Sequence, residues 1–312
     1  MKKNSPMIVW ENDEIRALKM LWKQGFTEKD IAEKLKRSVH AVSHEIIKIR
    51  KSGDLPERKE NNYDWLDEEF VDIPTHQDKA MKIISNKIMV WGDSHIPYLN
   101  LELSKHMFEI ARIWKIPDCL IAGDFFNQDA FSFFDGRDKY SWEKEKQKAR
   151  VFMNHLLLQF NKVYVILGNH DLRILRMLKF QETFKSLMLG ITTSQRVIVT
   201  EYPRAEINDD WLCVHPKSYS QISGRVAQKL AGKYHKNFIC PHGHFTSYSF
   251  DISGDYQCID IGGLMDYDKT EYVNFSITTH PRWVGGFLVL DKSYPYIFHE
   301  KTNWDFWKKA LK

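Results

Sequence analysis

The stretch KVYVILGNHD, residues 162–171, joins a short apolar run to a group of polar residues at its end. Two further stretches have the same form, KIMVWGDSH at residues 87–95 and DCLIAGD at residues 118–124. Apolar runs of this length that stop abruptly at glycine or polar residues are typical of buried β-strands. Helix-like segments lie between them, at residues 104–115 and 143–160. This alternation predicts an α/β protein in which helices connect the strands of a sheet.

Apolar segments follow one another at shorter intervals after about residue 195. They are RVIVTEY, DWLCVH, NFICPHGH, YQCIDIGG and GGFLVLD, which start at residues 196, 210, 237, 256 and 285. Shorter connections favour antiparallel neighbours. We therefore expect all five in a second, more antiparallel sheet that is stacked on the first.

Polar residues that can bind metal ions end five of the predicted strands. They are Asp93 and His95, Asp124, Asn169 and His170, His215, and finally His242 and His244. In open α/β folds, binding sites form where the carboxyl ends of strands meet. Carboxylate, amide and imidazole groups without thiolates suit Mn²⁺, Fe²⁺, Zn²⁺ or Mg²⁺ in sites with open water positions. Seven ligands, all of these except His170, are too many for one ion but fit two ions that share a carboxylate.

The order of these motifs, D-x-H, G-D, G-N-H-D, H and H-x-H, resembles that of the calcineurin-like metallophosphoesterases. The resemblance spans roughly residues 87 to 300 and implies two β-sheets packed as a sandwich and flanked by helices. It also implies two divalent ions, with Mn²⁺ expected first and Mg²⁺, Fe²⁺ or Zn²⁺ as alternatives. By the resemblance, the first ion binds Asp93, His95 and His244, the second binds Asn169, His215 and His242, and Asp124 bridges them.

The resemblance further assigns the chemistry of phosphoester hydrolysis. Two ions would clamp the phosphate and acidify a bridging water, which becomes the nucleophile. His170 would protonate the leaving oxygen, and Asp171 would hold the imidazole of His170 in the correct tautomer. One departure is Pro216, which follows His215 where family members usually have glycine. It places residues 217–219, including Tyr219, beside the site on a different backbone path.

Residues 10–53 have a different periodicity, which predicts three short helices. The N-caps that we expect are Asn12, Thr27 and Ser38, and the first and third helices should stop at Gly25 and Gly53. The apolar faces should bury Ile15, Leu18, Leu21 and Trp22 in the first helix, Ile31 and Leu35 in the second, and Val39, Val42, Ile46 and Ile49 in the third.

The tight turn near residues 36–37 makes the last two helices resemble a helix-turn-helix of the Myb-like or resolvase type. The third helix would then enter a DNA groove. Its candidate DNA-binding residues are Ser38, His40, Ser43, His44, Lys48 and Arg50. Residues 1–60 hold 14 Lys and Arg against 10 Asp and Glu, whereas the remaining 252 residues hold 31 of each. This local excess favours DNA binding, and a three-helix protein-interaction module is the alternative.

The predicted organisation is a helix-turn-helix domain at residues 1–53, a linker at 54–86 and a dimetal phosphoesterase domain at 87–312. Phe131, Phe133 and Phe134 follow the second strand and could either stack on unpaired bases or pack in the core. No apolar run approaches the roughly 18 residues of a membrane helix. The four cysteines lie in apolar runs, which suits buried thiols in a cytoplasmic protein.

The expected function is metal-dependent hydrolysis of phosphoesters, with nucleic acid as the favoured partner. A nuclease or phosphodiesterase that acts on DNA fits the fusion to a helix-turn-helix. A phosphomonoesterase or protein phosphatase is the first alternative. A DNA-binding regulator that uses the phosphoesterase domain only as a scaffold is the second.

Overall fold

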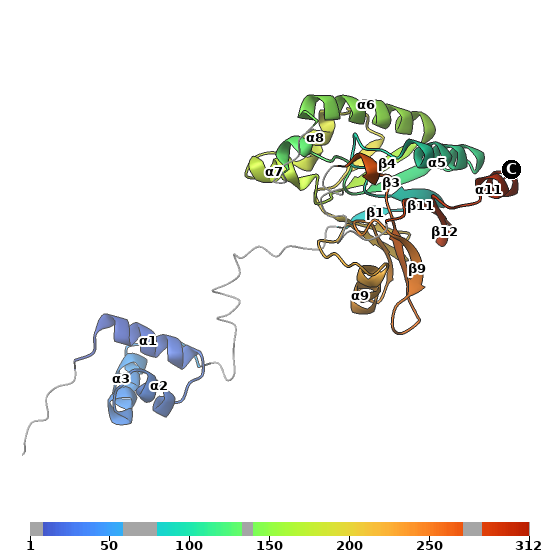
Figure 1. Cartoon of the computed structure of the whole chain (residues 1–312). Coiled ribbons are helices and arrows are strands. Elements are labelled where there is room, and N and C mark those ends of the chain that lie inside the picture. The colour runs from blue at the N-terminus through green and yellow to red at the C-terminus, as the bar shows by residue number, and fades with distance from the viewer. Residues whose placement is uncertain (1–8, 59–79, 133–139, 271–282, 312) are drawn as a thin grey trace, which may run out of the picture. The chain divides into compact units, whose positions relative to one another are not determined.

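A computed structural model of the chain describes residues 9–58, 80–132, 140–270 and 283–311. Phe133, Phe134 and most of the predicted linker therefore lie outside the described residues. Contacts between Cα atoms divide the chain into two compact units, Met1–Asp78 and Lys79–Lys312 (Figure 1). We refer to them as the helical unit and, after the family that its sequence motifs resemble, the phosphoesterase unit.

The helical unit contains the three predicted helices, α1 (Asn12–Lys23), α2 (Glu28–Lys34) and α3 (Val39–Lys51). Thr27 and Ser38 are the N-caps of α2 and α3, where their hydroxyl oxygens accept hydrogen bonds from Asp30 N and Ala41 N, both at 3.2 Å. Gly25 and Gly53 follow the ends of α1 and α3 with φ of +85° and +77°, the left-handed conformation that glycine adopts without strain. The predicted caps of α2 and α3 and both glycine stops are confirmed.

Two details of the helical unit differ from the prediction. Asn12 is the first helical residue rather than the N-cap, and the N–H of Glu11 before it donates to Glu14 Oε2 at 3.1 Å. Val39, which we expected to be buried, is 46% exposed, whereas Val42 of the same turn is fully buried. That core consists of Leu18, Leu21, Trp22, Ile31, Ala32, Val42, Ile46 and Ile49.

The phosphoesterase unit contains two β-sheets, each with six strands among the described residues. The first sheet has the order β12 (Tyr294–His299), β11 (Gly286–Asp291), β2 (Lys87–Trp91), β3 (Asp118–Ala122), β4 (Lys162–Ile166) and β5 (Val197–Val199). The second has the order β1 (Met81–Ile83), β6 (Arg204–Ile207), β7 (Trp211–Val214), β8 (Asn237–Cys240), β10 (Gln257–Ile261) and β9 (Thr246–Phe250).

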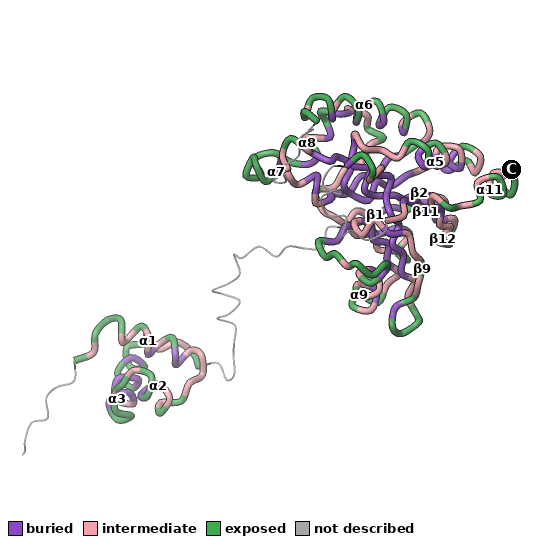
Figure 2. The backbone as a smooth tube through the Cα atoms, viewed as in Figure 1, coloured by how far each residue is buried: buried purple, intermediate pink, exposed green. Residues whose placement is uncertain are grey.

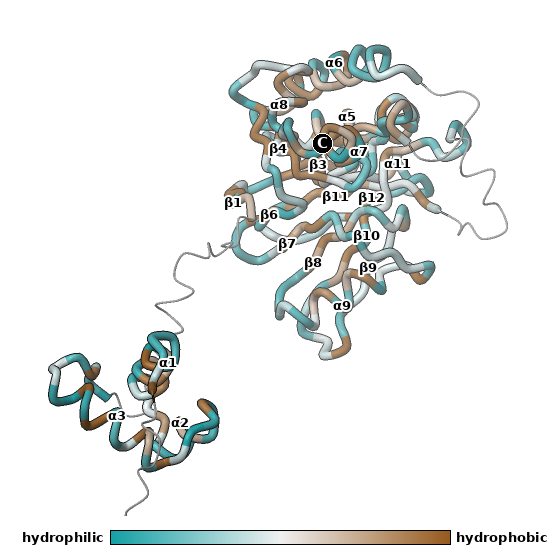
Figure 3. Tube along the Cα trace, turned by 90° about the vertical axis from the view of Figure 1, so that its left-hand side faces the viewer, coloured by the Kyte–Doolittle hydropathy of each residue, from teal (hydrophilic) through white to brown (hydrophobic). Residues whose placement is uncertain are grey.

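Helices cover the outer faces of this sandwich (Figure 1). They are α5 (Leu101–Ile113), α6 (Trp142–Gln159), α7 (Leu172–Met177), α8 (Phe184–Leu189), α9 (Arg225–Tyr234) and α11 (Trp304–Ala310). Alternate residues of β2 show the layering. Ile88 and Val90 face the core between the sheets, whereas Met89 and Trp91 face the core shared with α5 and α6. The strands are mostly buried in Figure 2 and carry the hydrophobic segments in Figure 3. The fold is the predicted α/β sandwich flanked by helices.

The division of strands between the sheets was predicted incorrectly at two places. β5 pairs parallel with β4, and β11 pairs antiparallel with β2, so both belong to the first sheet. The second sheet is not mainly antiparallel, because β1/β6, β7/β8 and β8/β10 are parallel pairs. The sequences of β5 and β11 contain no local signal for their partner strands, because strand pairing depends on tertiary contacts.

The predicted linker also ends too late. Residues 81–83 form β1, which pairs with β6 in the register Met81↔Ala205, and Ile83 is fully buried. This short edge strand lies among charged and polar residues, so its periodicity was too weak to recognise. No helix in the described ranges is long and apolar enough to cross a membrane. All four cysteines are buried and unpaired, as expected.

Candidate dimetal site

The polar strand ends converge at one edge of the sandwich. β2, β3 and β4 run parallel in one sheet, and β7 and β8 run parallel in the other, so their carboxyl ends lie together. The predicted ligands from these strands form overlapping groups whose donor atoms lie within 4.8 Å of one another. These groups are Asp93, Asp124, His215 and His242; Asp93, His95 and His244; and His95, Asp124 and His170.

The first half of the site is formed by Asp93, His95 and His244. Asp93 Oδ1 lies 3.6 Å from His95 Nε2 and 3.3 Å from His244 Nε2. Asp93 Oδ1 and His95 Nε2 are buried and make no hydrogen bond. The other carboxylate oxygen, Asp93 Oδ2, accepts from the backbone N–H of His242 at 2.8 Å. One oxygen thus holds the loop of the histidine pair, and the other points with the imidazoles at a common centre.

Asn169 completes the second half, together with Asp124, His215 and His242. Its side-chain oxygen lies 2.8 Å from His242 Nδ1, 3.0 Å from His215 Nε2 and 3.3 Å from Asp124 Oδ2. An amide oxygen that faces only acceptor atoms would ordinarily have to exchange places with its nitrogen. Convergence of lone pairs from an amide, a carboxylate and two imidazoles is instead what a divalent cation requires. These residues therefore fit a metal ion without exchange.

Asp124 connects the two halves. Its Oδ2 atom lies 3.7 Å from His95 Nε2 in the first half and 3.3 Å from His215 Nε2 in the second. Its Oδ1 atom accepts from the backbone N–H of His170 at 2.7 Å, which fixes the carboxylate plane. The geometry matches the bridging position that the resemblance implies.

The backbone at the site adopts conformations that are uncommon for residues with side chains. Asp93, His95, Asp124, His242 and His244 all have positive φ, between 42° and 78°. Such strained residues cluster at functional sites, where the surrounding structure holds them in place. Gly168 is required by the close packing, because a Cβ there would lie 2.1 Å from Asp124 N and Oδ1.

Hydrogen bonds that the Nδ1 atoms donate orient two of the imidazoles. His95 Nδ1 lies 2.9 Å from Asn127 Oδ1, and His215 Nδ1 lies 2.9 Å from the carbonyl oxygen of Ala122. A carbonyl oxygen can only accept, so each Nδ1 carries a proton, and in the neutral form of each ring Nε2 keeps its lone pair toward the centre. Such partners set the tautomer of metal-binding histidines.

Burial and close charges shift the pKa values of the group in opposite directions. Burial raises the pKa of Asp93, but the imidazoles of His244 and His95 outweigh it and bring the pKa well below its usual range. Burial lowers the pKa of His215, but the Asp124 carboxylate outweighs it and raises the pKa to about 9. Burial and the neighbouring His215 lower the pKa of His242 to about 4. The carboxylates thus stay ionised although both are buried.

His170 lies beside the first half of the site, with its ring 4.3 Å from that of His95. Its Nδ1 atom lies 3.2 Å from the carbonyl oxygen of Asn127, and its Nε2 atom lies 3.1 Å from Arg173 NH2. The Asn127 carbonyl accepts a hydrogen bond from Nδ1, which therefore carries the ring proton. Nε2 is then unprotonated and accepts a hydrogen bond from the Arg173 guanidinium. Burial and the nearby His95 lower the pKa of His170 well below its usual range. The resting imidazole is therefore neutral.

The predicted pairing of Asp171 with His170 is wrong. The two oxygens of Asp171 accept from the backbone N–H groups of Phe126 at 3.0 Å and Gly168 at 2.9 Å. A carboxylate one residue after His170 has its side chain directed into the loops behind the site. Asp171 therefore stabilises the loops that follow β3 and β4, and the carbonyl of Asn127 sets the His170 tautomer.

Sequence reasoning missed three residues around the site: Asn127, Arg173 and Trp283. Arg173 lies three residues after His170, a spacing that brings side chains together in a turn, whereas Asn127 contacts His95, 32 residues earlier in the chain. Trp283 has its ring 4.4 Å from that of His244, and no local signal connects positions so far apart in sequence. Buried Glu145 supports the Asn127 loop, since its Oε1 accepts from Gln128 N at 2.7 Å, and burial raises the pKa of Glu145 to about 8.

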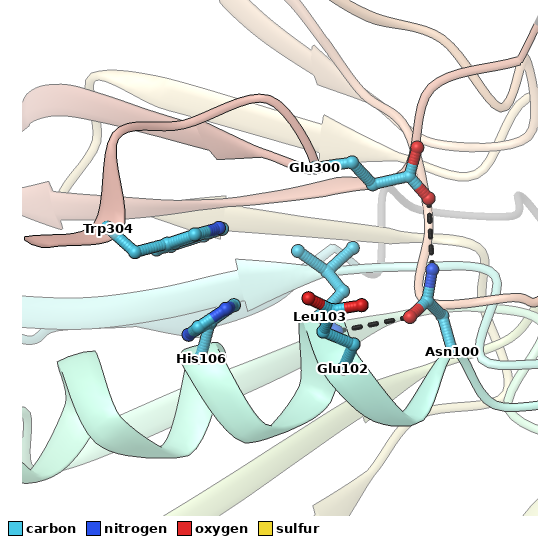
Figure 4. A pocket seen from close by; sticks show the side chains of 6 residues that line it. All are labelled: Asn100, Glu102, Leu103, His106, Glu300 and Trp304. Atoms are coloured by element: carbon cyan, nitrogen blue, oxygen red, sulfur yellow. Dashed lines mark hydrogen bonds between the residues drawn. The ribbon is translucent and has the colours of Figure 1, made fainter.

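A separate pocket of about 180 Å³ lies at the start of α5 (Figure 4). Its lining residues are Asn100, Glu102, Leu103, His106, Glu300 and Trp304. Within it, Asn100 Nδ2 donates to Glu300 Oε1 at 2.9 Å, and the rings of His106 and Trp304 stack at 4.2 Å. It contains none of the strand-end residues, so we do not assign it to the dimetal site.

The candidate DNA-binding residues of α3 do not all lie on one free surface. Ser38, His40, His44, Lys48 and Arg50 are exposed. The Ser43 hydroxyl instead donates to the Glu28 carboxylate, which ties α3 to α2. The guanidinium of Arg50 lies over the ring of Trp22 at 5.5 Å. Ile47, which the prediction omitted, is 50% exposed among the polar residues.

Comparison with known proteins agrees with this geometry. The profile of the calcineurin-like phosphoesterases matches residues 86–275. The chain belongs to the calcineurin-like phosphoesterase family.

A search of solved structures matches this chain to Vps29 of Chaetomium thermophilum and vacuolar protein sorting 29 of Cryptosporidium parvum. The first shares 13% identity at a TM-score of 0.36 and covers 70% of this chain and 87% of that one. The second shares 13% identity at a TM-score of 0.33 and covers 69% of this chain and 96% of that one. No curated protein sequence matches this chain at a significant level.

Proposed function

We propose that the protein is a divalent-metal-dependent phosphoesterase that hydrolyses phosphodiesters of nucleic acid. The observation that carries the proposal is the convergence of buried, unpartnered lone pairs at the strand ends. Asp93 Oδ1 and His95 Nε2 are buried without hydrogen-bond partners, and the Asn169 oxygen faces three acceptor atoms. Groups arranged in this way are costly to bury unless a cation lies among them.

The residues that would hold two ions are those of the two halves of the site. Asp93, His95 and His244 would bind one ion, Asn169, His215 and His242 the other, and Asp124 both. Two divalent ions would supply charge stabilisation for the phosphate and a hydroxide at neutral pH. Mn²⁺ is the first choice because oxygen and imidazole ligands without thiolates suit it, with Mg²⁺, Fe²⁺ and Zn²⁺ as alternatives.

The protein's own residues would manage the proton and the substrate charge. Once Arg173 has moved away from Nε2 of His170, which now accepts from it, Nε2 would take up a proton from solvent and pass this proton to the leaving oxygen. Arg173 would move its guanidinium to a phosphate oxygen as the substrate binds, since a phosphate competes well for a bidentate donor. The Asn127 carbonyl would keep the Nδ1 proton of His170 in place throughout.

The helical unit supports nucleic acid as the substrate. Its short turn between α2 and α3 and the exposed polar face of α3 are features of helix-turn-helix proteins that bind DNA. The positive excess of residues 1–60 would attract phosphates. Tethering would raise the local concentration of DNA near the phosphoesterase unit, which then needs little affinity of its own.

The test compares the wild type with Asp93→Ala in Mn²⁺. Substrates are plasmid DNA, single-stranded DNA, RNA, an aryl phosphodiester and an aryl phosphomonoester. We expect metal-dependent cleavage of at least one nucleic acid, which Asp93→Ala abolishes. Hydrolysis of the monoester alone would refute the nucleic-acid proposal and favour a phosphatase. No metal-dependent hydrolysis of any substrate would favour the scaffold alternative.

A further inference from the structure

Two aromatic side chains lie against the histidine pair of residues 242–244. The ring of Trp283 lies 4.4 Å from that of His244 at an interplanar angle of 79°. The ring of Tyr219 lies 6.3 Å from that of His242 at an angle of 89°. Tyr219 follows β7 and Trp283 precedes β11, so two separate loops bring aromatic rings to the same histidine pair.

The two aromatic residues differ in how firmly they are held. The Tyr267 hydroxyl donates to the Trp283 carbonyl at 3.1 Å, and Val284 N donates to the His244 carbonyl at 3.1 Å. Trp283 is thus fixed against the site, whereas Tyr219 is 47% exposed.

The aromatic pair continues a row of rings that crosses the site. His170 contacts His95 at 4.3 Å, His95 contacts His244 at 5.4 Å, and His244 contacts Trp283 at 4.4 Å between centroids. Arg173 lies beside His170 at one end of this row, and the aromatic pair lies at the other. A phosphodiester held over the row would have a cation near one flank and aromatic surface near the other.

We propose that Tyr219 and Trp283 form a stacking site for the base of an unpaired nucleotide next to the scissile phosphate. The inference rests on the proposed hydrolysis of nucleic acid and adds the class of substrate. Stacking needs a free base face, which a base inside a duplex does not offer. The site therefore selects single-stranded or frayed nucleic acid over intact duplex. Pro216, the departure next to His215, begins the loop that carries Tyr219 to this position.

The test compares a thymidine oligonucleotide with an abasic oligonucleotide of equal length and identical backbone. Stacking on an aromatic side chain contributes about 1–3 kcal/mol per base, which corresponds to about 5- to 150-fold in kcat/KM. We expect the wild type to cleave the thymidine strand faster than the abasic strand by a factor in this range. Tyr219→Ala should lower kcat/KM for the thymidine strand only, and Tyr219→Phe, which keeps the ring, should behave as the wild type.

Tyr294→Ala is the matched control, because Tyr294 is exposed and pairs with Asp291 beside the start of β2, at the end of the sheet opposite to the site. It should leave both rates unchanged. Equal loss on both strands in Tyr219→Ala, or wild-type rates on both, would overturn the stacking site while leaving the hydrolysis of nucleic acid intact. A wild type that cleaves neither strand nor any other nucleic acid would refute the proposed function itself, and the stacking site with it.

Discussion

The two units of the chain place their polar residues in opposite ways. In the phosphoesterase unit, the carboxylates of Asp93 and Asp124 are buried and converge with imidazoles from four strand ends. In the helical unit, most of the candidate DNA-binding residues are exposed, namely Ser38, His40, His44, Lys48 and Arg50. A buried polar group that serves no function is costly, whereas an exposed one costs nothing. Burial therefore makes the polar residues of the phosphoesterase unit a strong indication of function. The exposure of the α3 residues does not by itself indicate a function.

The comparison predicts that single substitutions act strongly in one unit and weakly in the other. The largest effect should come from Asp124→Ala, because Asp124 Oδ2 lies between both halves of the site. We expect metal-dependent phosphodiester hydrolysis to fall by about 10³-fold or more, since losing the bridging position removes several kcal/mol of charge stabilisation. Metal content and initial rates should be measured on the same preparation.

Asp255→Ala is the control for this substitution, since Asp255 is an exposed carboxylate in the turn between β9 and β10. It should keep both metal and activity. An Asp124→Ala variant that retains two ions and half the wild-type rate would show that Asp124 is not the bridging ligand.

His170→Ala should produce the next largest effect, a fall in kcat of about 10²–10⁴-fold with metal content nearly unchanged. The reason is that His170 contacts the site without completing either half, and its Nε2 atom faces Arg173. His155→Ala, on the exposed surface of α6, is the matched control. Loss of both ions in His170→Ala would assign this histidine to metal binding instead of proton transfer.

Asn127→Ala should weaken metal affinity by about 10- to 100-fold, the usual range for partners that orient a ligand. Asn127 Oδ1 fixes the proton on His95 Nδ1 and thereby directs Nε2 toward the centre. A metal titration with hydrolysis as the readout measures the effect, and excess metal should restore most of the rate. Asn154→Ala on α6 should leave the titration unchanged. If excess metal fails to restore activity, Asn127 has a role beyond orienting His95.

The parts of the site differ in how well they could be predicted from sequence. The ligands were predictable because each one ends an apolar strand, and parallel strands must bring such ends together. Asn127 acts through His95, and Arg173 now contacts His170 rather than the centre of the site, so neither was identified from its residue type alone. Trp283 reaches the site only through the pairing of β11 with β2, and an apolar strand does not encode its partner.

In the fold as well, features set by nearby residues were predictable, and features that depend on distant contacts were not. Helix caps in the helical unit were predictable because Thr27 and Ser38 act on the backbone within three residues. The placement of β5 and β11 was not, since it depends on contacts between distant segments. Asp171 follows His170 in sequence but does not pair with it in space. The Asp171 carboxylate instead accepts hydrogen bonds from the backbone N–H groups of Phe126 and Gly168.

Removing the helical unit should separate the two regions experimentally. Deletion of Met1–Asp78 should leave hydrolysis of an aryl phosphodiester unchanged, because every candidate ligand lies in the other compact unit. Affinity for DNA should fall, and its dependence on salt should weaken, since each neutralised phosphate contributes about 0.9 to the slope of log affinity against log salt. Binding isotherms at several salt concentrations measure both. An unchanged slope would remove the helical unit from DNA binding.

The smallest effect should come from Lys48→Ala on α3. Lys48 has a side chain that is 68% exposed, and its ammonium group forms one ion pair, with Glu45 Oε1 at 3.3 Å, so it is a surface cation within reach of a phosphate. A lysine of this kind contacts phosphates and not base edges. Its loss should weaken binding by a similar small factor on every DNA sequence and reduce the salt slope by about 1. Lys148→Ala on α6 should change neither quantity. If Lys48→Ala instead altered the preference between DNA sequences, Lys48 would contact base edges. The exposed polar face of α3 would then determine sequence specificity.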